Sequence, residues 1–78
     1  MFVHLTHMTR DGNNRLIPFE AIRLKVTDII AIGEEDEGHA YVETHKCTYA
    51  VNESPEEVEK LIQVVIRAND GMKPVLNL

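Results

Sequence analysis

The strongest constraint in this sequence is a well-marked helix start that follows a series of short β-like segments. Ser54 has the side chain of a helix cap, Pro55 suits the first helical position, and Glu57 can bond back to the Ser54 backbone. Apolar residues then recur with helical spacing, at Val58, Leu61, Ile62 and Val65. A helix with one apolar face needs a sheet to cover, so the sequence predicts an α+β fold.

The segments before this helix alternate between apolar and polar residues, which is the pattern of half-buried strands. The strands predicted in this way are Phe2–His7, Ala21–Val26, Ile29–Glu34, His39–Thr44 and Cys47–Val51. The short apolar piece at residues 16–19 contains Pro18, which cannot donate to a ladder, so we expect an edge segment or a covering loop there. The chain therefore predicts four to five antiparallel strands, in a curled sheet or a small open barrel, followed by one C-terminal helix.

The second half of the helix is apolar on more than one face. We expect the helix to run from Pro55 to about Ala68, because Asn69-Asp70-Gly71 is a good stop signal. One small sheet covers only one stripe of a helix, so a second surface is needed for the rest. The sequence predicts a homo-oligomer interface made by Val64 and Ile66 together with the tail at residues 70–78, which carries Val75, Leu76 and Leu78. The alternative for the tail is that it folds back on its own helix.

Length and composition exclude several classes of protein. The 78 residues allow a single domain, 1–78, with a modest core. The net charge of −5 argues against non-specific binding to nucleic acid or to anionic membranes. One cysteine permits no internal disulfide, which favours a cytoplasmic setting. We expect no signal peptide and no membrane span, since no apolar run is long enough.

The order of these segments resembles that of a known family. Val3-His4-Leu5-Thr6 comes first, Thr27-Asp28-Ile29-Ile30-Ala31-Ile32 follows, and the strand-to-helix junction runs from Val51 through Glu53-Ser54-Pro55-Glu56-Glu57-Val58 to Leu61-Ile62. The sequence is similar here to the small flagellar-protein FlbD family, whose relatives include uncharacterised phage and prophage proteins. The resemblance covers about Met1 to Ile66 and supplies no catalytic residues. It implies a compact sheet with one helix, acting as a regulatory or accessory protein.

Candidate binding residues lie in the β part of the chain. Arg23 and Lys25 share one face of a strand, where they could hold an anionic ligand or form an ordinary wetted face. Tyr41 and Tyr49 could serve as stacking platforms. The four histidines and Cys47 lack zinc-site spacing, so we expect no metal, and we expect Cys47 in the core. The acidic run at residues 34–37 is expected to be a solvated turn.

These observations lead to a functional hypothesis with one alternative. The sequence predicts a non-enzymatic binding and regulatory protein of bacterial or phage origin, without a cofactor. It would act as a homo-oligomer that binds a host protein or a small anionic ligand, and it would not associate with membranes. The alternative is a nucleic-acid-binding transcriptional regulator that uses Arg23 and Lys25.

Overall fold

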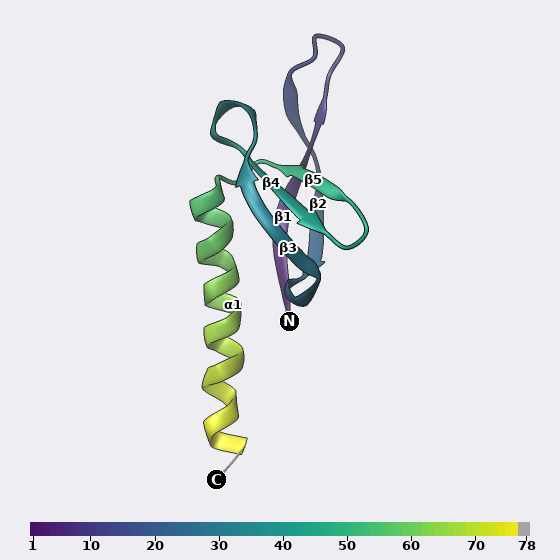
Figure 1. Ribbon diagram of the computed structural model, residues 1–78. Coiled ribbons are helices and arrows are strands. Elements are labelled where there is room, and N and C mark those ends of the chain that lie inside the picture. Colours follow the sequence, from purple (N-terminus) through teal and green to yellow (C-terminus); the bar gives the residue numbers. More distant parts are fainter. Residues whose placement is uncertain (77–78) are drawn as a thin grey trace.

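The computed structural model describes the backbone of residues 1–76 and the side chains of residues 1–69. The elements in chain order are β1 (Phe2–Arg10), β2 (Leu16–Lys25), η1 (Val26–Asp28), β3 (Ile29–Glu34), η2 (Asp36–Gly38), β4 (Ala40–Thr44), β5 (Thr48–Val51) and α1 (Pro55–Leu76). The two η elements are single 3-10 turns between strands (Figure 1). The chain thus has the predicted α+β fold, with five antiparallel strands and one C-terminal helix.

The strands form one open antiparallel sheet in the order β2-β1-β5-β4-β3. β1 and β2 make a long hairpin, and β3, β4 and β5 make the expected meander. The two parts are joined where β1 meets β5, and there the ladder has a single partner pair, His7 with Val51. Because the join is so narrow, the sheet curls into two halves that diverge on either side of it (Figure 1).

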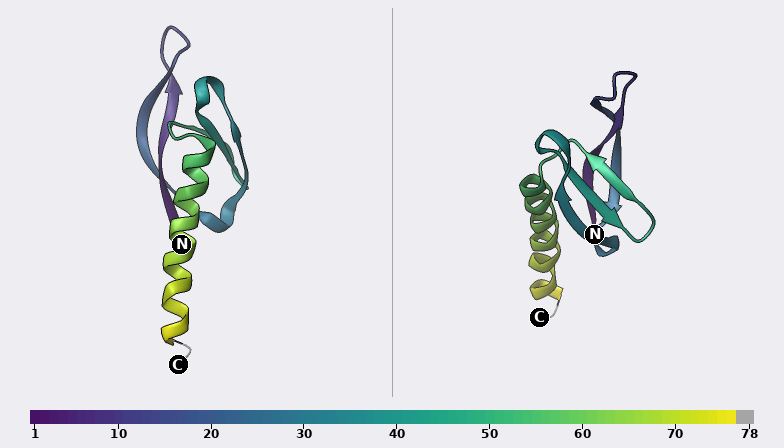
Figure 2. Two further views of the ribbon diagram at one scale, coloured as in Figure 1. Left: turned by 90° about the vertical axis from the view of Figure 1, so that its left-hand side faces the viewer. Right: turned by 45° about the horizontal axis from the view of Figure 1, so that its top comes forward.

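The core lies between these two halves and the helix. Its buried side chains are Val3, Leu5, Leu24, Ala40, Val42, Val51 and Val58. They come from four strands and from the first turns of α1, which packs on β1, β3 and β4 (Figure 2). Val58 is fully buried and Ile62 packs against the same cluster, so the expected apolar helix face does cover the sheet.

The junction between β5 and α1 confirms the predicted capping box. The Ser54 hydroxyl oxygen accepts from the Glu57 backbone N–H at 3.2 Å, and Glu57 Oε1 accepts from the Ser54 N–H at 3.2 Å. The preceding carboxylate, Glu53, accepts from the Thr6 backbone N–H at 3.0 Å and from the Thr6 hydroxyl at 3.2 Å. The start of α1 is therefore fixed both to its own first turn and to β1.

The prediction that the helix ends at about Ala68 is wrong. α1 continues through Asn69, Asp70 and Gly71 to Leu76. A glycine weakens a helix by about 1 kcal/mol relative to alanine, but it does not prevent one. The additional turns project beyond the sheet (Figure 1), which gives the molecule a long axis of 57 Å against 22 and 19 Å in the other directions.

The first two strands are longer than expected. β2 includes the Leu16–Phe19 piece, and Pro18 lies within it opposite Met8. A bulge next to His7 shifts the register at this point, which is a usual way for an edge strand to accommodate proline.

Cys47, which the sequence placed in the core, is exposed, and so is Ile30 of β3. Ile30 is 52% exposed, because an irregularity between Ile29 and Ala31 shifts the β3 register. Ile29 and Ile32 pack against the core instead. Cys47 is exposed because β5 begins at Thr48 and leaves the cysteine in the preceding turn.

Candidate functional site

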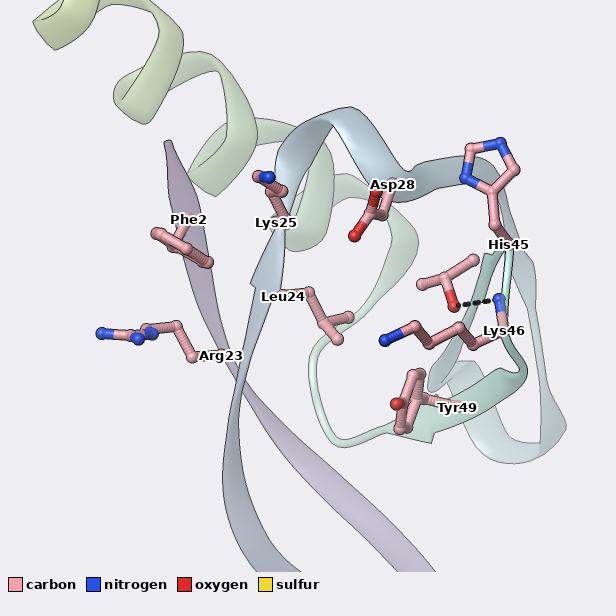
Figure 3. A pocket seen from close by; sticks show the side chains of 9 residues that line it. Phe2, Arg23, Leu24, Lys25, Asp28, His45, Lys46 and Tyr49 are labelled. Atoms are coloured by element: carbon pink, nitrogen blue, oxygen red, sulfur yellow. Dashed lines mark hydrogen bonds between the residues drawn. The ribbon is translucent and has the colours of Figure 1, made fainter.

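The candidate site is a cleft of about 300 Å³ between the end of β2 and the turn that joins β4 to β5 (Figure 3). We refer to it as the basic cleft. Its lining residues are Phe2, Arg23, Leu24, Lys25, Asp28, Thr44, His45, Lys46 and Tyr49. They come from β1, β2, η1, the end of β4, the β4–β5 turn and β5, so the curl of the sheet brings distant parts of the chain together.

One side of the basic cleft is built by β2. Alternation along the strand buries Leu24, while Arg23 and Lys25 stay exposed. The Arg23 guanidinium carbon lies 4.4 Å from the ring centroid of Phe2, in a cation–π contact. In Figure 3, Arg23 and Phe2 lie on one side of β2, and Leu24 points to the other side, into the cleft. β2 therefore presents cations on one face and an apolar side chain on the other.

The opposite side of the basic cleft is the β4–β5 turn, which Thr44 organises. The buried Thr44 hydroxyl donates to the Cys47 carbonyl at 3.0 Å and accepts from the backbone N–H groups of Lys46 and Cys47, each at 3.3 Å. The backbone N–H of His45 donates to the backbone carbonyl of Asp28 at 3.3 Å, which ties the turn to η1. These bonds fix the backbone from which Lys46 extends across the cleft (Figure 3).

The charge of the basic cleft opposes that of the whole protein. Arg23, Lys25 and Lys46 supply three positive charges against the single carboxylate of Asp28, in a chain of net charge −5. The ion pairs found among residues 1–69 are His7–Glu20 at 3.8 Å and Arg10–Asp36 at 2.9 Å, so none involves a cation of the cleft. The cleft thus offers unpaired positive charge to an anionic partner.

A second hollow, of about 320 Å³, lies between the β1–β2 turn and η2. It is lined by Arg10, Asn14, Arg15, Leu16, Asp36 and Glu37. Here the Arg10 guanidinium is already occupied, since it donates to Asp36 Oδ2 at 2.9 Å and to the Asn14 carbonyl at 3.0 Å. These bonds of Arg10 hold the β1–β2 hairpin against η2, and they leave this hollow with less free charge than the basic cleft.

Three of the four predicted binding residues meet in the basic cleft. Arg23, Lys25 and Tyr49 line it, whereas Tyr41 lies on the β3–β4 pair with its ring over Gly33. The sequence reasoning did not find Phe2, His45 or Lys46. The lysine follows a predicted strand end and could have been recognised as a turn cation, but only the curl of the sheet brings the turn close to β2.

The predicted interface residues divide between described and undescribed parts of the chain. On α1, Val64 is 63% exposed and Ile66 is 37% exposed. Leu61, which the sequence placed on the sheet-facing stripe, is 38% exposed. The side chains of Val75 and Leu76, and the whole of Leu78, lie outside the described residues.

The histidines occupy separate environments. The His7 ring is half-buried, edge-on to Tyr49 at 5.4 Å and to Phe19 at 6.1 Å between centroids. His39 Nδ1 lies 2.9 Å from the Asn52 carbonyl oxygen. Within the part of the chain that the structure describes, no group of three or more metal-ligating side chains comes together. Among those same residues, no helix has the length and apolar character needed to cross a membrane.

Comparisons with known proteins found no match among protein-family models, curated proteins or solved structures. The resemblance to the FlbD family therefore stays a prediction from the sequence.

Proposed function

We propose that this protein is a non-enzymatic binding and regulatory module that engages an anionic partner at the basic cleft. The observation that carries the proposal is a set of three cations at a hollow of about 300 Å³ in an acidic protein. Lys46 extends into the hollow and Arg23 and Lys25 stand on the outer face of β2 at its rim, and none of the three forms an ion pair with a side chain of residues 1–69. The hollow has a size found among ligand sites, and it combines charged side chains with the apolar surfaces of Phe2, Leu24 and Tyr49. The partner is a host protein or a small anionic ligand.

The side chains in the basic cleft favour binding over catalysis. Asp28 is its single carboxylate, and the ring of His45, the residue type that most often acts as a general acid or base, points away from Leu24 and Tyr49 (Figure 3). The Thr44 hydroxyl could in principle act as a nucleophile, but it already donates to the Cys47 carbonyl. These positions support a module that holds a partner and changes its availability, in the accessory role that the FlbD resemblance implies for a cytoplasmic bacterial or phage protein.

A pull-down with charge-reversed variants tests this function. The wild-type protein and a Lys46→Glu variant would be immobilised and exposed to a bacterial lysate, with bound proteins and small molecules identified by mass spectrometry. We expect the reversal to remove at least nine-tenths of a specifically retained partner. Lys60→Glu, on the exposed side of α1, is the matched control and should retain it. Equal retention by all three proteins would contradict binding at the cleft.

A nucleic-acid-binding regulator is the alternative, favoured by one observation. Arg23 and Lys25 lie near two aromatic rings, Phe2 on their own side of β2 and Tyr49 in the cleft. Proteins that bind single-stranded nucleic acid combine cations for the phosphates with aromatic rings for base stacking. Fluorescence anisotropy with a labelled single-stranded oligonucleotide tests this. Affinity that falls steeply with salt, and that Lys46→Glu abolishes, would favour the regulator over protein binding.

A further inference from the structure

β2 is an exposed edge strand whose outer backbone has no neighbour in the sheet. It is the terminal strand in the order β2-β1-β5-β4-β3, and its inner side pairs with β1 in unbroken register from Glu20 to Lys25. Among the described residues, α1 packs mainly on β1, β3 and β4. An edge of this kind presents free N–H and C=O groups along its length, to which an extended segment can add.

The side chains at this edge have a period that matches an extended partner. Arg23 and Lys25 are two residues apart on one face of β2, so their backbone positions are separated by about 6.5 Å. Leu24 projects from the opposite face into the basic cleft, where Tyr49 lies across from it (Figure 3). A strand added to this edge would place alternate side chains opposite the cations and the others opposite Leu24.

The placement of the cations argues against one compact anion. Figure 3 shows Arg23 directed away from the cleft on one side of β2, while Lys46 extends into the cleft from the other side. Two cations that point to opposite sides of the strand do not converge on a single phosphate or carboxylate, which needs its donors at about 2.7–2.9 Å. Cations spread along an edge suit an anion whose charges are spread along its own length.

We propose that β2 receives an extended segment of a partner protein in which acidic and apolar residues alternate. The acidic side chains pair with Arg23 and Lys25, and the apolar ones pack on Leu24 and Tyr49 inside the basic cleft. Lys46 borders the far side of the cleft, across from Leu24. This inference rests on the proposed function, since it names the class of partner that the basic cleft takes.

The test uses two labelled eight-residue peptides of identical composition, titrated into the full-length protein and followed by fluorescence anisotropy. In one peptide glutamate and valine alternate; in the other four glutamates precede four valines. We expect the alternating peptide to bind at least tenfold more tightly. The double change Arg23→Glu with Lys25→Glu should weaken its binding at least tenfold, and Lys60→Glu with Arg67→Glu, on α1, should leave it unchanged.

Backbone pairing is tested on the peptide itself, so that folding of a variant does not enter. Two further alternating peptides would carry N-methyl groups on every second amide, one on the odd positions and one on the even positions. Strand addition uses the N–H groups on one edge only, so one of these peptides should lose binding and the other should keep it. Binding of both at the original affinity would overturn strand addition.

The remaining outcomes separate this inference from the proposed function. Equal binding of the alternating and block peptides at the cleft would overturn the inference and leave anion binding in place. Failure of both peptides, together with failure of the lysate experiment, would overturn both. Displacement of the alternating peptide by a tighter-binding oligonucleotide would assign β2 to nucleic acid. A fall in oligomer mass on Arg23→Glu with Lys25→Glu, measured by light scattering, would assign it to a second copy. Either result would also overturn the inference.

Discussion

At the scale of single residues, the start of α1 depends on two reciprocal hydrogen bonds. The Ser54 hydroxyl satisfies a backbone N–H in the first turn, so Ser54→Ala should lower the free energy of unfolding by about 1 kcal/mol. Urea denaturation followed by circular dichroism measures this change. Ser54→Asp keeps an accepting oxygen at the cap and should stay close to wild type. If the alanine variant unfolds at the wild-type urea concentration, the cap does not stabilise the helix.

Tyr49 and Cys47 give a second prediction at this scale. The interaction with the Cys47 side chain, followed by desolvation, raises the pKa of Tyr49 above its ordinary value of 10.0. A raised pKa means that the folded state holds this proton more tightly than the unfolded state does. The stabilisation is therefore complete below pH 10.0 and is lost as the pH rises through the pKa of the folded protein.

The substitution Cys47→Ala tests the cause of this shift. Without the thiol, the pKa of Tyr49 should fall toward its ordinary value, and stability should depend less on pH in the alkaline range. The carbon NMR shift of the phenol ring, followed through an alkaline titration, reports the pKa directly. Thr48→Ala, an exposed neighbour, should leave the titration unchanged. An unmoved Tyr49 titration in Cys47→Ala would show that the thiol is not the cause.

At the scale of the elements, the contact between β3 and β4 depends on a glycine. Gly33 and Tyr41 are cross-strand partners, and a Cβ at position 33 would collide with the Tyr41 ring. Gly33→Ala should therefore destabilise the protein by about 1–3 kcal/mol in urea denaturation. Gly12→Ala is the matched control, because a Cβ there meets no other atom within 4 Å. The cost of Gly33→Ala should shrink when Tyr41 is also replaced by serine. The same cost in both backgrounds would mean that the ring is not responsible.

The elements also show how far the sequence alone determines this structure. Local chemistry was enough for the Ser54–Glu57 capping box and for the meander of β3, β4 and β5, because caps and alternation act over a few residues. Local chemistry did not predict the surroundings of Ile30 and Tyr41. A register shift in β3 exposes Ile30, and Tyr41 packs on a glycine of the neighbouring strand. Both outcomes depend on which strands pair and in what register.

The basic cleft was predictable to the same extent. Arg23 and Lys25 follow from alternation within one strand. Phe2 and Lys46 do not, because they reach the cleft through the register of β1 with β2 and through the curl at the narrow join between β1 and β5. Sites that combine separate elements need the topology as well as the pattern.

At the scale of the whole molecule, α1 is longer than the body that supports it. The helix has 22 residues, about 33 Å at 1.5 Å per residue, and its last turns extend beyond the sheet (Figure 2). Leu61, Val64 and Ile66 are also exposed on this helix, by 38%, 63% and 37%. We therefore propose that copies of the chain associate through α1.

The change Val64→Glu tests this association. Val64 lies outside the core cluster, so a charge there should leave the protomer folded while it removes apolar contact between copies. Light scattering at micromolar concentration should give a multiple of 8.9 kDa for the wild type and about one chain mass for the variant, with unchanged circular dichroism. Gln63→Glu adds the same charge at a neighbouring exposed polar position and should keep the wild-type mass.

By contrast, Ile62→Glu should unfold the protomer, because Ile62 packs against the core. A wild-type protein that already scatters as a single chain would show that these apolar side chains do not join copies of the protein.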